Sequence, residues 1–440
     1  MQKHFYELAD YLAGKLHDDE VYLATFDGEE SDFVRFNHSA IRQAGRVTQA
    51  DITLDLIRGE RHAEATTTLS GDPATDRARL DSALDNLRER LPHVPDDPYL
   101  LYATEVLNTE EHGDDRLPDR QPTVDAILNA GEGRDLVGIY AQGGIFNGFA
   151  NSLGQRNWFS TYSFHLDWCF YHSKDKAVKS SYAGFDWDDA EFDRKVTSAA
   201  EQLAILAREP KTIEPGGYRV YLAPAALAEI FDILAWGGFG LKDHRTKNTS
   251  LLKMVEDGAR LGESVTISEN TRDGIAPNFQ SAGFVKPDYV VLIQNGQYEN
   301  CLASARSARE YGVRTNGANE GEYPESLDVA AGDLPEGEVL DRLDTGVFIN
   351  QLWYLNYSDR PACRITGMTR FATFWVEGGR IVAPLNVMRF DETIYRVLGE
   401  NLAALTRERE FIPSAQTYGG RSTDSLRLPG ALVEGFEFTL

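Results

Sequence analysis

The feature that most limits the fold is a series of segments whose residues alternate over strand-length stretches. Residues 32–43 (DFVRFNHSAIRQ), 47–59 (VTQADITLDLIRG) and 61–71 (RHAEATTTLSG) follow one another with only short gaps. Such alternation is typical of strands with one covered face, so these segments predict a three-stranded meander. A helix is expected to begin at Pro73, with Asp72 as its N-cap, and to cover the sheet. The first half is therefore predicted to be α+β.

Turn and helix signals divide the rest of the chain. Two long strands are expected on either side of a turn at residues 151–154, and helices are expected around 124–130 and 188–208. Pro210, Pro215, Gly216 and Gly217 mark a linker. We therefore expect an N-terminal α+β domain over residues 1–212 and a β-rich C-terminal domain over residues 213–440.

The C-terminal half contains strong hairpin signals. Asn295-Gly296 and Gly378-Gly379 each separate two strand-like segments, and both positions of such turns favour positive φ. A strand at 218–222 leads into a helix that begins at Pro224. A further helix is expected from Asp391 to about Arg407, followed by a β-rich C-terminus.

Charge and cysteine content exclude several classes of protein. Asp and Glu total 69 and Lys and Arg total 44, a net charge of −25, which disfavours direct binding to nucleic acid or to an anionic membrane. No apolar stretch reaches the roughly 18 residues of a membrane-spanning helix, and the N-terminus predicts an amphipathic helix, not a signal peptide. Three cysteines form no disulfide framework, so we expect a cytoplasmic protein.

Standard catalytic motifs are absent, and one cluster resembles a metal site. His165, Asp167 and Cys169 would share one face of a strand. Neighbouring residues on one strand face lie about 6.5 to 7 Å apart, too far for one zinc ion unless the strand bulges, which favours ordinary strand residues over a metal site. Glu229 and Asp232, three residues apart on the expected helix, are interpreted as a solvated pair. His244, flanked by charged residues, is predicted at the surface.

The order of several segments resembles the TldD/PmbA family, also called modulators of DNA gyrase. The segments that carry the resemblance are VRFNHSAIRQ, ANSLG, GYRVYLAPAALAEIF, KNTSLLKMVEDGARLGESVTI, VVLIQNGQYENCLAS and TGMTRFATFWVEGGRIVAPL. They extend over nearly the whole chain. The TldD-like members of this family carry an H-E-x-x-x-H motif on the helix after the L-x-P strand, and a C-terminal Cys completes their zinc site. The TldE/PmbA-like members lack these ligands and pair with a TldD-like chain.

The resemblance places this chain in the branch without zinc. Its ligand positions fall near Leu234, Phe239 and Tyr418, and no His occurs between Ala223 and Asp243. Loss of all three ligands leaves no tetrahedral site. The resemblance therefore implies a non-catalytic subunit with no metal, no cofactor and no catalytic residue of its own.

The implied function is to complete a metallopeptidase that acts on small or unfolded peptides. The implied partner is a TldD-like zinc peptidase subunit, and the chain alone is expected to form a homodimer through its β-rich half, where FINQLWYLNY is strongly apolar. Trp353, Tyr354 and Tyr357 are candidates for peptide contact, although such aromatic residues more often belong to the core. Two alternatives remain: a stand-alone peptide-binding homodimer, and a peptidase with a metal site around His165, Asp167 and Cys169.

Overall fold

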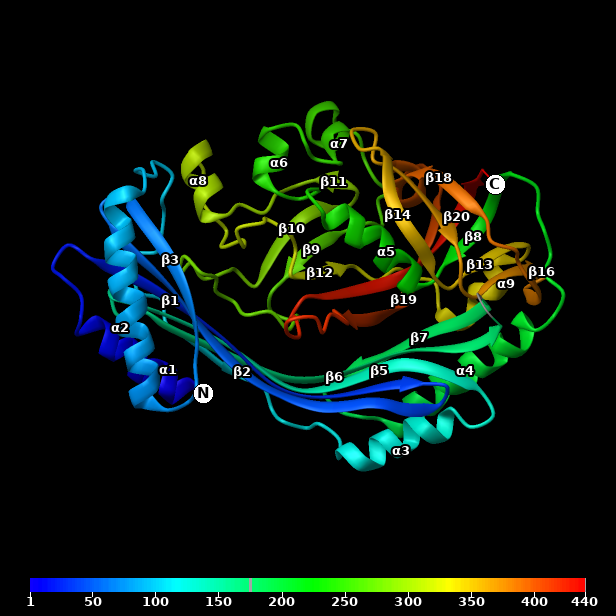
Figure 1. The fold of residues 1–440 in the computed structure, drawn as a ribbon. Coiled ribbons are helices and arrows are strands. Elements are labelled where there is room, and N and C mark those ends of the chain that lie inside the picture. The colour runs from blue at the N-terminus through cyan, green and yellow to red at the C-terminus, as the bar shows by residue number, and fades with distance from the viewer. Residues whose placement is uncertain (174–175, 440) are drawn as a thin grey trace.

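The computed structural model describes residues 1–173 and 176–439 and shows two α+β domains, each built on its own sheet (Figure 1). The first sheet has seven strands in the order β3-β2-β1-β5-β6-β4, and β7 also pairs with β6. Its strands are β1 (Val21–Asn37), β2 (Ala40–Arg58), β3 (Arg61–Thr68), β4 (Thr109–His112), β5 (Asp135–Asn151), β6 (Arg156–Ser173) and β7 (Lys176–Gly184). The β4–β6 pair is parallel and the others are antiparallel, so the predicted meander is confirmed.

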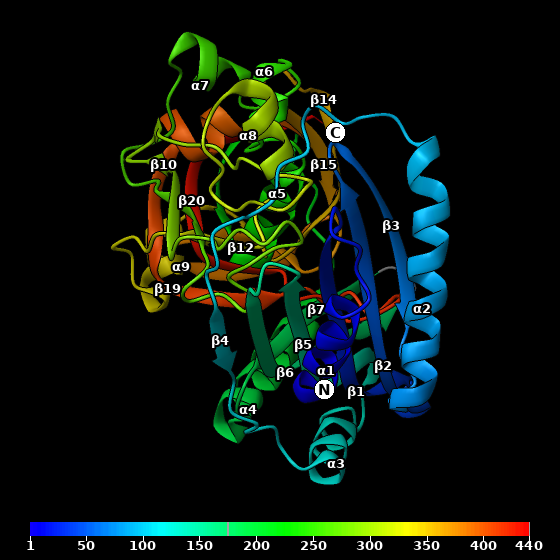
Figure 2. The same ribbon diagram turned by 90° about the vertical axis from the view of Figure 1, so that its left-hand side faces the viewer.

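Four helices cover one face of this sheet. They are α1 (Gln2–Ala13), α2 (Pro73–Arg90), α3 (Arg120–Ala130) and α4 (Asp189–Leu206). Figures 1 and 2 show α1, α2 and α3 on the side turned away from the C-terminal domain. Helix α4 lies at one end of the sheet, where Lys195 donates to Glu410 of the C-terminal domain at 2.6 Å. The expected start of α2 is confirmed, because Asp72 accepts a hydrogen bond from the Thr75 amide and Pro73 is the first helical residue.

Strand alternation decides which residues face the helices and which face the second domain. Even-numbered residues of β1, β5 and β6 pack under the helices; Phe26, Tyr140 and Trp168 are almost completely buried there. Odd-numbered residues therefore point to the opposite face, toward the C-terminal domain. His165 and Asp167 lie on this second face.

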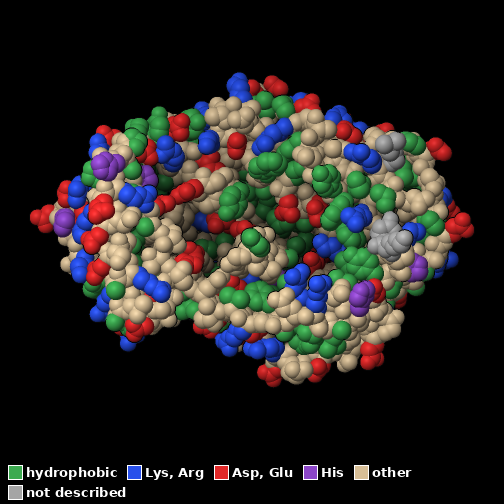
Figure 3. Space-filling view, viewed as in Figure 1, with side chains coloured by type: hydrophobic (Ala, Val, Ile, Leu, Met, Phe, Trp, Pro, Cys, Tyr) green, Lys and Arg blue, Asp and Glu red, His purple; other side chains and the backbone are tan. Residues whose placement is uncertain are grey.

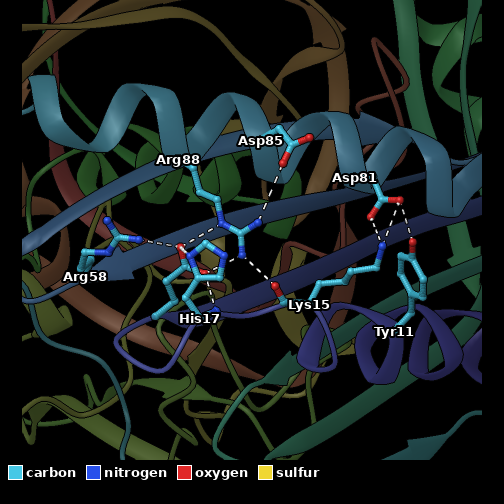
Figure 4. Close-up of polar contacts among 8 residues, drawn as sticks. Tyr11, Lys15, His17, Arg58, Asp81, Asp85 and Arg88 are labelled. Carbon is cyan, nitrogen blue, oxygen red and sulfur yellow. Dashed lines mark hydrogen bonds and ion pairs between the residues drawn. The ribbon is translucent and has the colours of Figure 1, made fainter.

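An ionic cluster attaches α2 to the sheet (Figure 4). Arg88 on α2 donates from Nε and Nη2 to the two carboxylate oxygens of Glu20, at 2.9 and 2.7 Å. Arg58, the last residue of β2, donates to the same carboxylate at 2.8 Å. Tyr11 on α1 donates to Asp81 on α2 at 2.7 Å, so the two helices and the sheet are joined by charged contacts as well as by apolar packing.

The C-terminal domain is built on a sheet of thirteen strands. The main path is β11-β10-β9-β12-β20-β8-β13-β16-β17, and β14, β15, β18 and β19 join beside it. The strands are β8 (Gly216–Leu222), β9 (Ile267–Asn270), β10 (Tyr289–Gln294), β11 (Gln297–Tyr298), β12 (Ser326–Val329), β13 (Gly346–Ile349), β14 (Leu352–Asp359), β15 (Arg364–Thr369), β16 (Thr373–Glu377), β17 (Arg380–Pro384), β18 (Arg389–Thr393), β19 (Leu402–Pro413) and β20 (Ser425–Phe438). The helices are α5 (Pro224–Ala235), α6 (Leu241–Arg245), α7 (Leu252–Asp257), α8 (Ala305–Tyr311) and α9 (Val339–Leu343).

Both predicted hairpins of this domain are confirmed. Asn295 and Gly296 turn between β10 and β11 with φ of 48° and 75°, and Gly378 and Gly379 turn between β16 and β17 with φ of 56° and 72°. The strand at β8 and the helix beginning at Pro224 are also present.

The predicted helix from Asp391 to Arg407 is wrong. Asp391 lies in β18, a short helical turn covers Arg396–Glu400, and β19 follows. Gly399 has φ −121° and ψ −110°, which ends the helical turn. The residues after it pair with β20, and ladder hydrogen bonds along this strand replace those of a helix.

Two other expectations need correction. Residues 32–43 form a hairpin and not one strand, because His38 and Ser39 take positive φ between β1 and β2. His244 is buried, with its Nε2 2.7 Å from the Gly238 carbonyl oxygen, because α6 packs into the domain.

The domain boundary near residue 212 falls between α4 and β8 and stays a prediction. Among the described residues, no helix combines the length and apolar composition that a membrane crossing requires.

Candidate functional site

A cleft of about 950 Å³ lies between the first sheet and the C-terminal domain. Its walls are formed by β6 and β7 on one side, by α5 and residues 406–415 on the other, and by α4 at one end. Figure 3 shows the molecule hollowed in this region, with acidic side chains around the hollow. Strand β7 pairs with β6 alone among the described strands, so the cleft runs along a sheet edge without a second strand partner. Asn350 donates from Nδ2 to the Lys179 carbonyl oxygen of this edge at 3.0 Å.

Two carboxylates project into the cleft from α5. Glu229 and Asp232 are the only charged residues of this helix, and both line the cleft. Glu229 is half-buried and Asp232 is exposed, so their interpretation as a solvated pair holds within the cleft. Gln351 donates from Nε2 to Glu229 Oε1 at 2.9 Å and fixes that carboxylate. The Asp232 side chain is exposed in the cleft, whose walls displace part of the surrounding water. Burial, together with the charges of Glu229 and Asp424, raises the pKa of Asp232 to about 6.

The facing wall carries two residues of the predicted cluster from β6, His165 and Asp167, whereas Cys169 is not among the residues that line the cleft. His165 is buried, and its Nε2 has no hydrogen-bond partner in the described structure. Burial and the nearby Arg421 lower the pKa of His165 to about 3, so its ring is neutral. Asp167 lies 3.9 Å from the Lys179 ammonium, whose charge partly offsets the burial that raises the pKa of this carboxyl. Burial raises the pKa of Cys169 to about 11, so the thiol stays protonated at neutral pH.

Arg421 ties the loop of residues 414–424 to the first sheet. Its guanidinium donates to the Gly143 carbonyl oxygen at 3.2 Å and to the carbonyl oxygen and Oγ of Ser163 at 3.0 and 2.7 Å. Burial lowers the pKa of Arg421 to about 10, which still leaves the group charged at neutral pH. This contact joins a loop of the C-terminal domain to β5 and β6.

The sequence and the fold were compared with known proteins. The family model described as the PmbA/TldA metallopeptidase C-terminal domain matches residues 215–440. The chain belongs to the PmbA/TldD family. No curated protein matches its sequence.

Solved structures resemble the chain over nearly its entire length. TldE from Thermococcus kodakarensis superimposes with a TM-score of 0.79 at 15% identity, covering 99% of this chain and 100% of that one. A protein described as a candidate modulator of DNA gyrase from Thermotoga maritima gives a TM-score of 0.77 at 16% identity, covering 100% of both chains. A similarly described protein from Bacteroides thetaiotaomicron gives 0.72 at 15% identity, covering 99% of this chain and 98% of that one. These likenesses establish a shared fold.

The residues of this PmbA/TldD chain do not fit a catalytic zinc ion. Leu234 and Phe239, near two of the expected ligand positions, are buried in the apolar core. Tyr418, near the third, lies in the 414–424 loop with 92% of its surface exposed. Among residues 1–173 and 176–439, no group of three or more His, Cys, Asp or Glu side chains is arranged to hold a metal ion. The donors that zinc requires are not brought together.

The predicted aromatic contacts do not line the cleft. Trp353, Tyr354 and Tyr357 lie on β14, and none of them is among the residues that form the cleft walls. Tyr357 donates from its hydroxyl to the Ile233 carbonyl oxygen at 2.8 Å, whereas Tyr354 is 76% exposed. Their role in peptide contact stays a prediction that the geometry of this cleft does not favour.

The sequence predicts Glu229 and Asp232 on α5 but not their place in the wall of a cleft. The available signal was the presence of two carboxylates on a helix whose other residues are apolar. Only the docking of the two domains turns that helix face into a cleft wall, and such long-range packing leaves no local pattern in the sequence.

Proposed function

We propose that this chain is the TldE/PmbA-like, non-catalytic subunit of a metallopeptidase that acts on small or unfolded peptides. A TldD-like subunit would supply the zinc ion, and this chain would supply one part of the substrate cavity. The observation that carries the proposal is a large cleft along a sheet edge in a PmbA/TldD chain whose expected zinc positions are apolar or lie in a loop. We place the pair in the cytoplasm, in keeping with three cysteines that form no disulfide.

Strand β7 supports the capture of an extended peptide. Its residues 178–183 line the cleft, and a free sheet edge can bind a peptide by main-chain hydrogen bonds with little dependence on side chains. Unfolded peptides offer such unpaired main-chain groups, whereas folded proteins do not. The chain would therefore hold substrate while the partner cleaves it.

Reconstitution tests the proposal. The purified chain is mixed with the TldD-like chain from the same source, and cleavage of an unfolded, fluorescently labelled peptide is measured. We expect no cleavage by this chain alone and chelator-sensitive cleavage by the pair. Chelator-sensitive cleavage by the isolated chain would contradict the proposal and would favour a metal site around His165, Asp167 and Cys169. Peptide binding without any gain of activity on adding the partner would favour a stand-alone binding protein.

A further inference from the structure

A second, strongly acidic pocket adjoins the cleft. It has a volume of about 540 Å³ and shares Tyr323 and Asp424 with the cleft walls. Its carboxylates are those of Asp27, Glu29, Asp51, Glu320, Glu325 and Asp424. Arg421 is the one lysine or arginine among the described residues that line it, and its guanidinium donates to Gly143 and Ser163. Lys286, which does not line the pocket, pairs with Glu325, and the other carboxylates still leave the pocket with an excess of negative charge.

Strand register places two of these carboxylates directly opposite each other. Asp27 on β1 is the cross-strand partner of Asp51 on β2. Like charges in this arrangement destabilise a sheet. Asn147, the partner of Asp27 on β5, donates from Nδ2 to Asp27 Oδ1 at 2.8 Å. Burial and the Asp51 charge raise the pKa of the Asp27 carboxyl, and the amide of Asn147 offsets them only in part.

Two residues that line the same pocket have buried oxygen atoms without a hydrogen-bond donor. Glu29 is only 4% exposed, and its Oε2 accepts hydrogen bonds from Gln49 Nε2 at 3.1 Å and from the Arg421 amide at 3.2 Å. Its Oε1 is buried and has no partner in the described structure. The Asn147 Oδ1 is likewise buried without a partner. Buried polar atoms are nearly always hydrogen-bonded in native proteins, so two residues of this lining with unpartnered acceptors favour a ligand that supplies donors.

We propose that this pocket is a subsite for a cationic nitrogen group, an ammonium or guanidinium, of the peptide held in the adjoining cleft. The inference rests on the proposed function. An ammonium supplies three hydrogen-bond donors and a guanidinium five, and either would neutralise the Asp27–Asp51 repulsion. The group can come from the amino terminus of the peptide or from a lysine or arginine side chain.

Peptide binding to the full chain distinguishes these sources. The probe is an unfolded, labelled peptide of about a dozen residues, rich in Gly, Ser and Ala, with a free amino terminus and one lysine. A second form is acetylated at the amino terminus, and a third carries norleucine in place of lysine. A charged hydrogen-bonding group contributes about 1.5–3 kcal/mol. We expect loss of the recognised charge to weaken binding by at least about tenfold, in the acetylated form if the terminus is bound and in the norleucine form if the side chain is bound.

Matched variants show whether the preference for a positively charged peptide arises in this pocket. Asp27→Asn and Asp51→Asn should weaken binding of the charged peptide and remove the discrimination between peptides, whereas Asp114→Asn, at an exposed site outside the pocket, should not. Each of the two pocket variants should unfold at the same or a higher temperature than the wild type, since it removes a like-charge contact, and this measurement also shows that it folds. Equal binding of all three peptides by the wild type would overturn the subsite and leave the proposed function standing. No binding of any peptide would overturn both.

Discussion

Glu20 is a buried carboxylate that accepts hydrogen bonds from two arginines, Arg88 and Arg58. Burial raises its pKa, but hydrogen bonds from Arg88 and from the His17 amide outweigh this and lower the pKa to about 2, from 4.5. We expect Arg88→Ala to reduce the free energy of unfolding by about 2 kcal/mol. This is less than the roughly 3–5 kcal/mol for removing a partner from an isolated buried pair, because Arg58 remains.

The pH dependence of this loss follows from the depressed pKa. The ionised Glu20 stabilises the fold fully above about pH 4.5, and this contribution disappears as the pH falls toward 2. Urea unfolding of wild type and variant should therefore differ at pH 7 and converge in acid. Lys3→Ala is the control, since this side chain is 90% exposed and its loss should cost less than about 0.5 kcal/mol. A pH-independent difference for Arg88→Ala would contradict the assignment.

At the scale of an element, Arg421 and Gln49 join the 414–424 loop to the first sheet. Arg421→Met removes the donors to Gly143 and Ser163 and should release the loop from the first sheet. Loss of several hydrogen bonds to a charged group, worth more than about 1.4 kcal/mol together, should speed chymotrypsin cleavage after Tyr418 by at least about tenfold. Arg407→Met is the control, because within the described part of the chain its guanidinium donates one hydrogen bond, to the Asp333 carbonyl oxygen. Equal cleavage rates in both variants would show that other contacts order the loop.

Sequence signals predicted elements well where the decisive interaction is local. Asp72 caps α2 through its own near neighbour, and Asn295-Gly296 requires only the backbone freedom of two residues. The segment from Asp391 to Arg407 was misassigned because helix propensity is outweighed there by pairing with β20, a strand far along the chain. The family and its α+β fold could be predicted from the order of many short segments. The acidic pocket could not, because it brings β1 and β2 together with residues some 370 positions later.

At the scale of the whole molecule, the C-terminal domain exposes several large aromatic residues. Trp236 at the end of α5 is 65% exposed, and Trp353 and Tyr354 on β14 are 38% and 76% exposed. Strand β14 pairs with β15 alone among the described strands, so its other edge is also available. Neighbouring exposed aromatic residues beside a free strand edge favour association.

We therefore expect the isolated chain to form a dimer through this β-rich half, burying more than about 2,000 Å² in total. High salt should not dissociate it, because screening acts on charge pairs and not on apolar burial; with a net charge of −25 per chain, added salt should favour association by weakening repulsion. Light scattering at low and high salt measures this directly. Combined Trp353→Ser and Tyr354→Ser should yield a monomer, whereas Tyr418→Ser, which alters a still more exposed aromatic residue in another part of the domain, should not. A wild-type monomer at micromolar concentration in both salts would refute the dimer, and it would also weaken the proposal that this chain supplies part of a cavity shared between subunits.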